Sequence, residues 1–311
     1  MRDYRDSPYD DTLGVFGELR RSWTEARPVD RIAYRIGAAL IVSGAFHFGV
    51  WVISGDAWDG PVSWRKATTF GLSFGLTLIT VVWVSSFLCL SSRERKVLIG
   101  TFAAVCTLET ALVTMQVWRG TPSHFNQETT FDTAVSRALA AGGAVIVIVI
   151  ATLTVMSFRA NPTVERRMRL ALRMGFIALD LSLLIGAAMI VEGVTQVYAG
   201  NQHEAYEVAG FLKPGHAATM HGILILPALA WLTSFTGWPE SRRDAFVHIG
   251  VAGYALFAVA IIIDSFSGLG AIAYVVAGLG GLLLLGAGVL TIAAVIRASS
   301  VARAGGLTNR S

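Results

Sequence analysis

Long apolar runs separated by short polar segments make up most of this chain. A hydrocarbon core about 30 Å thick needs roughly 20 apolar residues in a helix that rises about 1.5 Å per residue. The pattern therefore predicts an all-α polytopic membrane helix bundle with about eight transmembrane helices. The expected spans are 33–54, 69–90, 97–118, 133–157, 171–198, 216–236, 245–264 and 269–296.

These spans divide the chain into an N-terminal segment (1–31), a transmembrane domain (32–297) and a C-terminal tail (298–311). Four apolar residues recur at near-helical spacing in the first segment: Leu13, Phe16, Leu19 and Trp23. The spacing is compatible with a short helix lying on the membrane surface and with an irregular tail.

Composition supports membrane insertion and removes several functional classes. The chain is 54% hydrophobic and 15% charged, with a mean hydropathy of +0.59, whereas soluble domains are about 25% charged. Two cysteines in 311 residues exclude a disulfide scaffold. No lysine lies inside a span, which excludes a retinal Schiff base, and the sequence contains no P-loop, GxSxG or HExxH motif. Nucleic-acid binding is not expected.

The distribution of basic residues predicts the orientation of the bundle. All but five of the 25 Lys and Arg lie at one set of span ends; the five are Arg65, Lys66, Arg119, Arg137 and Lys213. By the positive-inside rule, the basic ends face the cytoplasm. We therefore expect both termini inside, in the inner membrane of a bacterium, with the lipid bilayer as the main partner.

Most histidines lie at the opposite, outer side. His47 and His221 fall at compatible depths, about 12 and 8 Å below the outer ends of their spans. Two facing histidines are the ligands that haem b needs, and a copper site could add His216 or Met220. A second possible metal set is His124, His203 and His216. The alternative is that each histidine is a single hydrogen-bonded side chain within a bundle.

Polar residues also form a candidate outer loop and two intramembrane stripes. The loop carries Arg119, His124, Asn126 and Asp132, and it could fold back as a lid; Asp132 could instead cap the fourth span. The stripes pair Glu109 with Gln116 and Glu192 with Gln196, and Asp180 lies deeper. Acids at this depth are typical of a proton relay or coupling site. The alternative is a structural hydrogen bond to Thr110 or Ser182.

Three segments carry a resemblance to known proteins: Ser63–Lys66, Gln116–Asn126 and Lys213–Gly222. They resemble a family of uncharacterised multi-spanning bacterial inner-membrane proteins, which implies a fold and a location but no activity. The four residues Thr219–Gly222 also resemble the run around a haem-ligating histidine of haem–copper oxidases. That resemblance implies haem ligation by His221 alone.

Three functions compete at this point. The first is a haem- or metal-binding redox protein linked to quinone or proton chemistry. The second is a proton-coupled transporter for a small solute, although no internal repeat is evident. The third is a membrane-embedded hydrolase or transferase in which outer histidines and Asp132 hold a metal-activated water.

Overall fold

The protein is described here from a computed structural model, which places residues 14–208 and 210–308, with side chains to residue 300. The described part is helical and contains no strand, and eight of its segments are long and apolar enough to cross a membrane. The prediction of an all-α polytopic bundle is confirmed. The helices are α1 (Gly14–Thr24), α2 (Pro28–Ser54), α3 (Trp64–Ser85), α4 (Ser92–Trp118), α5 (Thr130–Ser157), α6 (Arg166–Tyr198), α7 (Lys213–Met220), α8 (Gly222–Thr233), α9 (Glu240–Ser267) and α10 (Ala271–Thr308).

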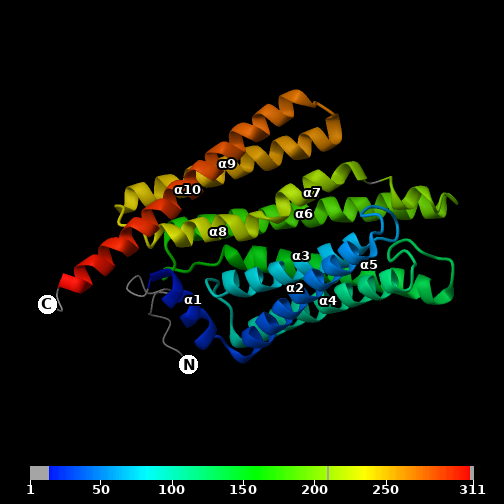
Figure 1. Ribbon diagram of the computed structural model, residues 1–311, viewed down its shortest axis with the longest axis horizontal. Coiled ribbons are helices and arrows are strands. Elements are labelled where there is room, and N and C mark those ends of the chain that lie inside the picture. Colours follow the sequence, from blue (N-terminus) through cyan, green and yellow to red (C-terminus); the bar gives the residue numbers. More distant parts are fainter. Residues whose placement is uncertain (1–13, 209, 309–311) are drawn as a thin grey trace.

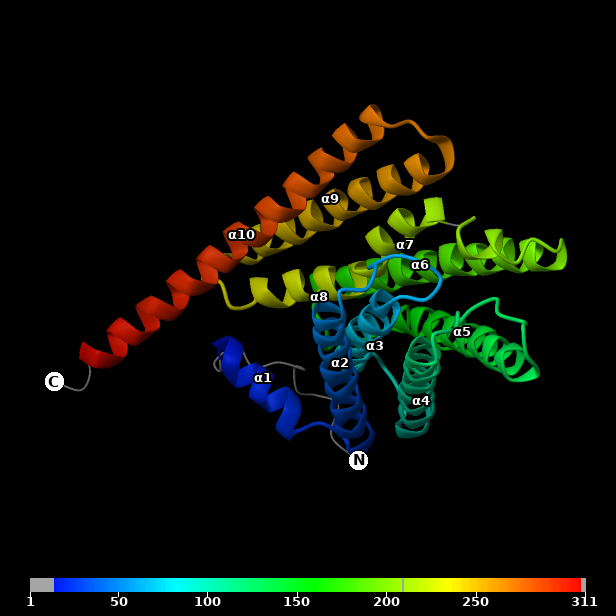
Figure 2. The same ribbon diagram turned by 45° about the vertical axis from the view of Figure 1, so that its right-hand side comes forward.

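The spanning helices run back and forth between two ends of the molecule, which lie at the left and right of Figure 1. Helix α1 and the last turns of α10 lie at one end, called here the terminal end. The opposite loop end carries three long connections, 55–63, 119–129 and 199–212. Turning the molecule shows that α9 and α10 form a hairpin at the edge of the bundle, beside α8 (Figure 2).

Glycines allow two helix pairs to approach closely, as small residues do in membrane bundles. Gly71 of α3 faces Gly44 of α2, and a Cβ on Gly71 would lie 2.6 Å from the Gly44 backbone nitrogen. Gly253 of α9 and Gly280 of α10 form a similar contact, where a Cβ on Gly280 would lie 2.6 Å from the Gly253 carbonyl oxygen.

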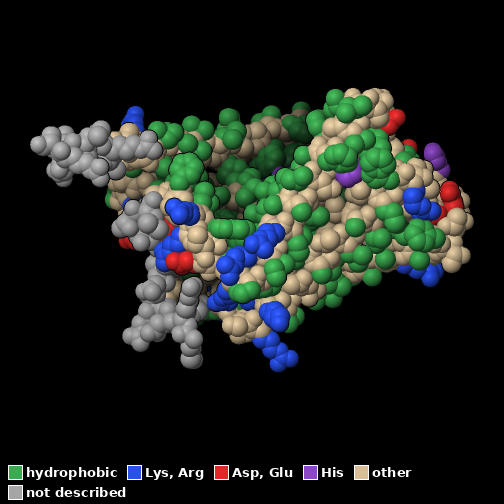
Figure 3. Space-filling view, turned by 60° about the horizontal axis from the view of Figure 1, so that its bottom comes forward, with side chains coloured by type: hydrophobic (Ala, Val, Ile, Leu, Met, Phe, Trp, Pro, Cys, Tyr) green, Lys and Arg blue, Asp and Glu red, His purple; other side chains and the backbone are tan. Residues whose placement is uncertain are grey.

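Hydrophobic side chains cover much of the outer surface, while charged groups gather toward the two ends (Figure 3). Helix α10 is the most exposed example, with Leu282 at 67% and Leu285 at 64% exposure. A surface of this kind is stable against lipid tails and unstable in water, so the packing agrees with membrane insertion.

The sixth expected span is not one helix. It divides into α7 and α8 at His221, and Pro227, a residue that can kink a helix, lies inside α8. At the break the His221 backbone N–H donates to the Thr219 carbonyl. The hydroxyl of Tyr254 on α9 donates to the carbonyls of Ala218 and Thr219, at 2.5 and 3.2 Å, so the break is held by a side chain from a neighbouring helix.

At the terminal end, a buried ion pair joins α4 to α2. Arg95 donates from Nε to both carboxylate oxygens of Asp30, at 2.9 and 3.0 Å. Its other nitrogens donate to the carbonyls of Ser85 and Val82, at 2.7 and 3.1 Å. Helix α3 ends at Ser85, five residues before the predicted end of that span, and its freed carbonyls help to bind the guanidinium.

The N-terminal segment contains α1, on which Phe16, Leu19 and Trp23 are all exposed. Leu13, the fourth residue of the predicted apolar face, lies outside the described residues. Trp23 packs against Tyr34 of α2, with ring centroids 6.1 Å apart. The exposed apolar residues suit a helix on a membrane surface, and that location stays a prediction.

Candidate functional site

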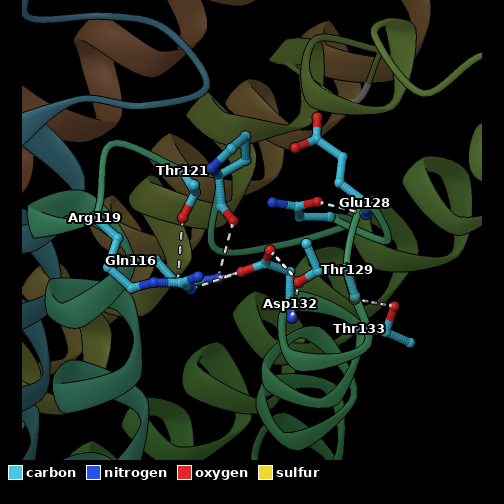
Figure 4. Close-up of polar contacts among 9 residues, drawn as sticks. Gln116, Arg119, Thr121, Glu128, Thr129, Asp132 and Thr133 are labelled. Carbon is cyan, nitrogen blue, oxygen red and sulfur yellow. Dashed lines mark hydrogen bonds and ion pairs between the residues drawn. The ribbon is translucent and has the colours of Figure 1, made fainter.

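A polar network joins α4 and α5 at the loop end (Figure 4). Asp132 of α5 accepts hydrogen bonds from Gln116 Nε2 at 2.9 Å and from Arg119 Nη1 at 2.7 Å, both from α4. Thr129 Oγ1 donates to the other carboxylate oxygen at 2.6 Å. The sequence analysis placed Arg119 and Asp132 in the candidate outer loop and Gln116 on an intramembrane stripe. The structure brings these three residues together.

The network is buried on its acidic side and open on its basic side. Gln116 and Asp132 are 0% and 2% exposed, whereas the Arg119 side chain is 38% exposed. Arg119 and Thr121 both donate to the Gln116 amide oxygen. Every polar atom of the buried core of this network therefore has a partner, which is typical of an interaction that fixes two helix ends together.

The start of α5 corrects one prediction. Asp132 does not cap this helix, because the N-cap is Thr129, whose hydroxyl accepts from the Asp132 backbone N–H at 3.1 Å. Asp132 is thereby free to turn its carboxylate toward α4. Threonine is a common N-cap, so a signal for this helix start was present in the sequence.

The connection between α4 and α5 folds back over the bundle, as predicted. Phe125 has a φ of +64°, an uncommon conformation for a residue with a side chain. Its N–H donates to Ser136 Oγ at 2.9 Å, its carbonyl accepts from Gln202, and its ring packs against Gly193 of α6. The loop therefore covers the ends of α5 and α6.

Two residues of this loop that were predicted as site residues are shielded from solvent, Asn126 fully and His124 in part. Asn126 is 0% exposed; its Oδ1 accepts from the Glu128 N–H at 2.9 Å, and its Nδ2 has no partner among the described residues. His124 contacts Ser123 Oγ at 3.0 Å and lines a cavity of about 30 Å³ with Phe125. Burial, together with the nearby Lys66 ammonium, lowers the pKa of His124 to about 4.

Glu109 lies deeper on α4, about 10 Å below Gln116 along the helix. Its side chain is buried, with 4% exposure, and its Oε1 has no hydrogen-bond partner within the described part of the chain. The carboxyl packs against Gly142 of α5, where a Cβ would come within 2.1 Å of Oε1. The predicted hydrogen bond to Thr110 is not formed, since the Thr110 hydroxyl is also unpartnered.

The other stripe lies on α6 and is less enclosed. Asp180, Glu192 and Gln196 are each half-buried. Asp180 contacts the Thr154 hydroxyl of α5, and Gln196 accepts from Asn201 at 3.1 Å. Ser182, the predicted structural partner of an acid, instead contacts His216. The two predicted stripes therefore lie on different helices, α4 and α6.

His47 is buried among aromatic rings and both of its ring nitrogens are engaged. Its Nδ1 lies 2.6 Å from the Ser43 carbonyl, and its Nε2 accepts from Trp118 Nε1 at 3.0 Å. The ring stacks on Trp64, with centroids 6.1 Å apart. This is the geometry of a neutral histidine whose hydrogen bonds are satisfied inside a bundle, which the sequence offered as the alternative to ligation.

The other histidines that were predicted as ligands do not share a site with His47. His216 is half-buried on α7, with Nδ1 2.8 Å from the Ser182 carbonyl, while His221 and His203 are exposed. Met220 packs against the hydrophobic core. Across the described residues, no group of three or more His, Cys, Asp or Glu is placed to hold a metal ion. The histidines predicted as cofactor or metal ligands are thus dispersed over α2, α7, the break between α7 and α8, and two loops.

Sequence reasoning missed several residues that position these sites. Arg95 was counted only among the basic residues that predict the orientation and Asp30 was not singled out, although the two pair across 65 positions. Tyr254 showed no sign of holding the break between α7 and α8. Long-range partners of this kind depend on which helices are neighbours, and hydropathy carries no information about that.

Comparisons with protein-family models, with curated proteins and with solved structures found no match. The resemblance to an uncharacterised membrane family, and the local one to a haem-ligating helix, therefore stay predictions.

Proposed function

We propose that this protein is a proton-coupled transporter of a small solute, in which Glu109 carries the proton. One observation carries the proposal. Glu109 is an acid buried within a membrane-spanning helix, with an oxygen that has no hydrogen-bond partner and no described ion pair.

A buried carboxylate without a cation is unstable, because burial removes its hydration and nothing replaces it. Such a group binds a proton when enclosed and releases it only when water or a cation reaches it. Proton exchange at Glu109 therefore requires its surroundings to change, and this requirement is how an intramembrane acid couples a proton to a conformational step.

The network above Glu109 provides a candidate entrance. Gln116 shares the face of α4 that carries Glu109, two turns closer to the loop end. The Arg119–Asp132 ion pair, 2.7 Å long, joins α4 to α5 directly above it. Separating this pair would free the ends of α4 and α5 to move apart. The buried apolar residues Val113, Val135 and Leu139, which lie between the pair and Glu109 along these helices, would then also have to separate before water reached the carboxyl. We therefore assign the pair the role of an outer gate.

The broken helix supports the same function. Many transporters use discontinuous helices near the middle of the bilayer, where freed backbone groups line a binding site. Here α7 ends at Met220 and α8 begins at Gly222, and the Tyr254 hydroxyl donates to the carbonyls of Ala218 and Thr219 at the break. Movement of the Tyr254 hydroxyl away from the break would make the Ala218 carbonyl available to a solute.

The redox and hydrolase hypotheses depend on histidines acting together. Because His47 is fully hydrogen-bonded and His221 is exposed, the contacts give neither hypothesis the support that Glu109 gives to transport. A haem b or copper site would give the purified protein a visible absorption band or bound copper, which the absorption spectrum and metal content measure.

Proton flux in liposomes tests the proposal. Purified protein is reconstituted with a pH-sensitive dye inside, and a potassium diffusion potential drives proton entry. We expect wild-type flux above that of protein-free liposomes, loss of this excess in Glu109→Gln, and partial retention in Glu109→Asp, which keeps the carboxyl.

A matched control is Asp264→Asn. Asp264 is also an acid in a spanning helix, but it accepts from the Gly270 N–H at 2.7 Å, and the amide can still accept that bond. We expect its flux to equal that of the wild type. Equal flux in Glu109→Gln and wild type would contradict the proposal.

A further inference from the structure

A basic cavity of about 370 Å³ lies near the terminal end, away from the network and from Glu109. It is lined by Arg166, Arg169, Leu170 and Arg173 of α6 and by His248 of α9. The four α6 residues are spaced by three, one and three positions, so they share one face over the first two turns of the helix.

Backbone carbonyls, rather than acids, hold Arg169 and Arg173 in place. Arg169 Nη1 donates to the Asn161 carbonyl at 3.0 Å and to the Val164 carbonyl. Arg173 Nε donates to the Ser157 carbonyl at 3.3 Å. Neutral carbonyls orient a guanidinium without cancelling its charge, so both arginines keep a positive charge and further N–H groups for a ligand.

The nearest acids are engaged elsewhere. Glu165 and Asp244 both pair with Arg167, which is 2% exposed; its distance to Asp244 is 3.5 Å. The cavity lining contains no carboxylate, and Arg166 is exposed, with no described hydrogen bond or ion pair. Three guanidinium groups thus surround one cavity without a counter-charge from its walls.

We propose that this cavity binds a phosphate group, as the head group of an anionic phospholipid or as a free phosphate. Guanidinium groups match phosphate oxygens in both charge and geometry. Basic pockets between helices at the cytoplasmic side are typical sites for anionic lipid head groups. The exposed residues Ile249 and Leu256 continue along α9 from His248, which offers an apolar track for an acyl chain.

The test measures binding to purified, delipidated protein in a neutral detergent by native mass spectrometry. The probes are phosphatidylglycerol, phosphatidylcholine and inorganic phosphate. We expect phosphatidylglycerol to bind more tightly than phosphatidylcholine. An arginine near a membrane surface contributes about 1 kcal/mol, so Arg166→Gln should weaken binding about fivefold.

In the variant with Arg166, Arg169 and Arg173 all changed to Gln, we expect phosphatidylglycerol binding to weaken further, about a hundredfold if the three effects add. Arg166→Gln keeps the test valid if that variant fails to fold, since Arg166 makes no described contact. The control is Arg93→Gln, an exposed arginine on α4 at the same end. It should bind the lipid as the wild type does.

The probes also separate the two sources of phosphate. Tight binding of inorganic phosphate that is lost in Arg166→Gln would identify a site for a free anion. Binding of phosphatidylglycerol alone would identify a lipid site. Equal binding of all probes by wild type and Arg166→Gln would overturn the proposal.

Discussion

Arg95 and Glu109 lie on the same helix and are equally buried, at 4% exposure, yet their surroundings are opposite. Arg95 has a carboxylate and two carbonyls as partners, while Glu109 Oε1 has none among the described residues. A paired buried charge stays in one state and fixes the helices around it. An unpaired buried acid changes state with its surroundings, so only the second suits proton transfer.

The paired region should be the more sensitive to substitution. Arg95→Ala leaves Asp30 buried without a cation, which typically costs about 3–5 kcal/mol. We expect the free energy of unfolding in detergent micelles, measured by denaturant titration, to fall by that amount. Lys96→Ala, at an exposed neighbouring position, should change it by less than about 0.5 kcal/mol. A fall of less than about 1 kcal/mol in the free energy of unfolding of Arg95→Ala would contradict the contrast drawn between Arg95 and Glu109.

The outer network should show an intermediate effect. Asp132→Asn keeps the shape of the side chain but removes the charge that accepts from Arg119 and Gln116. A loss of about 1–3 kcal/mol in the same titration is expected for a buried hydrogen-bonded group. Glu128→Gln is the control, because that carboxylate points away from the network (Figure 4). Equal stability of both variants would show that the network does not join the helix ends.

The smallest effect should come from His124, a base that the fold keeps neutral. Its pKa lies near 4, below the ordinary value of 6.5, because it is buried beside Lys66. The unfolded chain therefore binds a proton that the folded chain does not, and stability falls as the pH drops from 6.5 toward 4. His124→Gln should reduce this fall in melting temperature, and His203→Gln, at an exposed site, should leave it unchanged. An identical pH profile for both variants would contradict the burial argument.

The sequence predicted the bundle well, because eight long apolar runs have few alternatives in a membrane. It also identified Gln116, Arg119 and Asp132, since polar residues stand out against an apolar background. It did not predict which helices are neighbours, and the interpretation of the histidines depended on that. His47 and His221 have compatible depths, but depth alone does not bring two side chains together. The break at His221 was also missed, because the sequence there contains no proline and the hydrophobic run continues through it.

The arginines of the basic cavity show the same limit of prediction from sequence. Arg166, Arg169 and Arg173 were read as an orientation signal, which they remain. Their spacing placed them on one face, but the cavity they share depends on the packing of α9 against α6. The sequence indicated the positive charge of the α6 face, and the packing of α9 against α6 encloses the cavity.

The central claim is that Glu109 takes up and releases a proton within the bundle. Infrared difference spectroscopy of the reconstituted protein, recorded between low and high pH, measures this directly through the band of protonated carboxyl groups. The account predicts a band in the wild type that is absent in Glu109→Gln and preserved in Asp132→Asn. The same band in wild type and Glu109→Gln would contradict it.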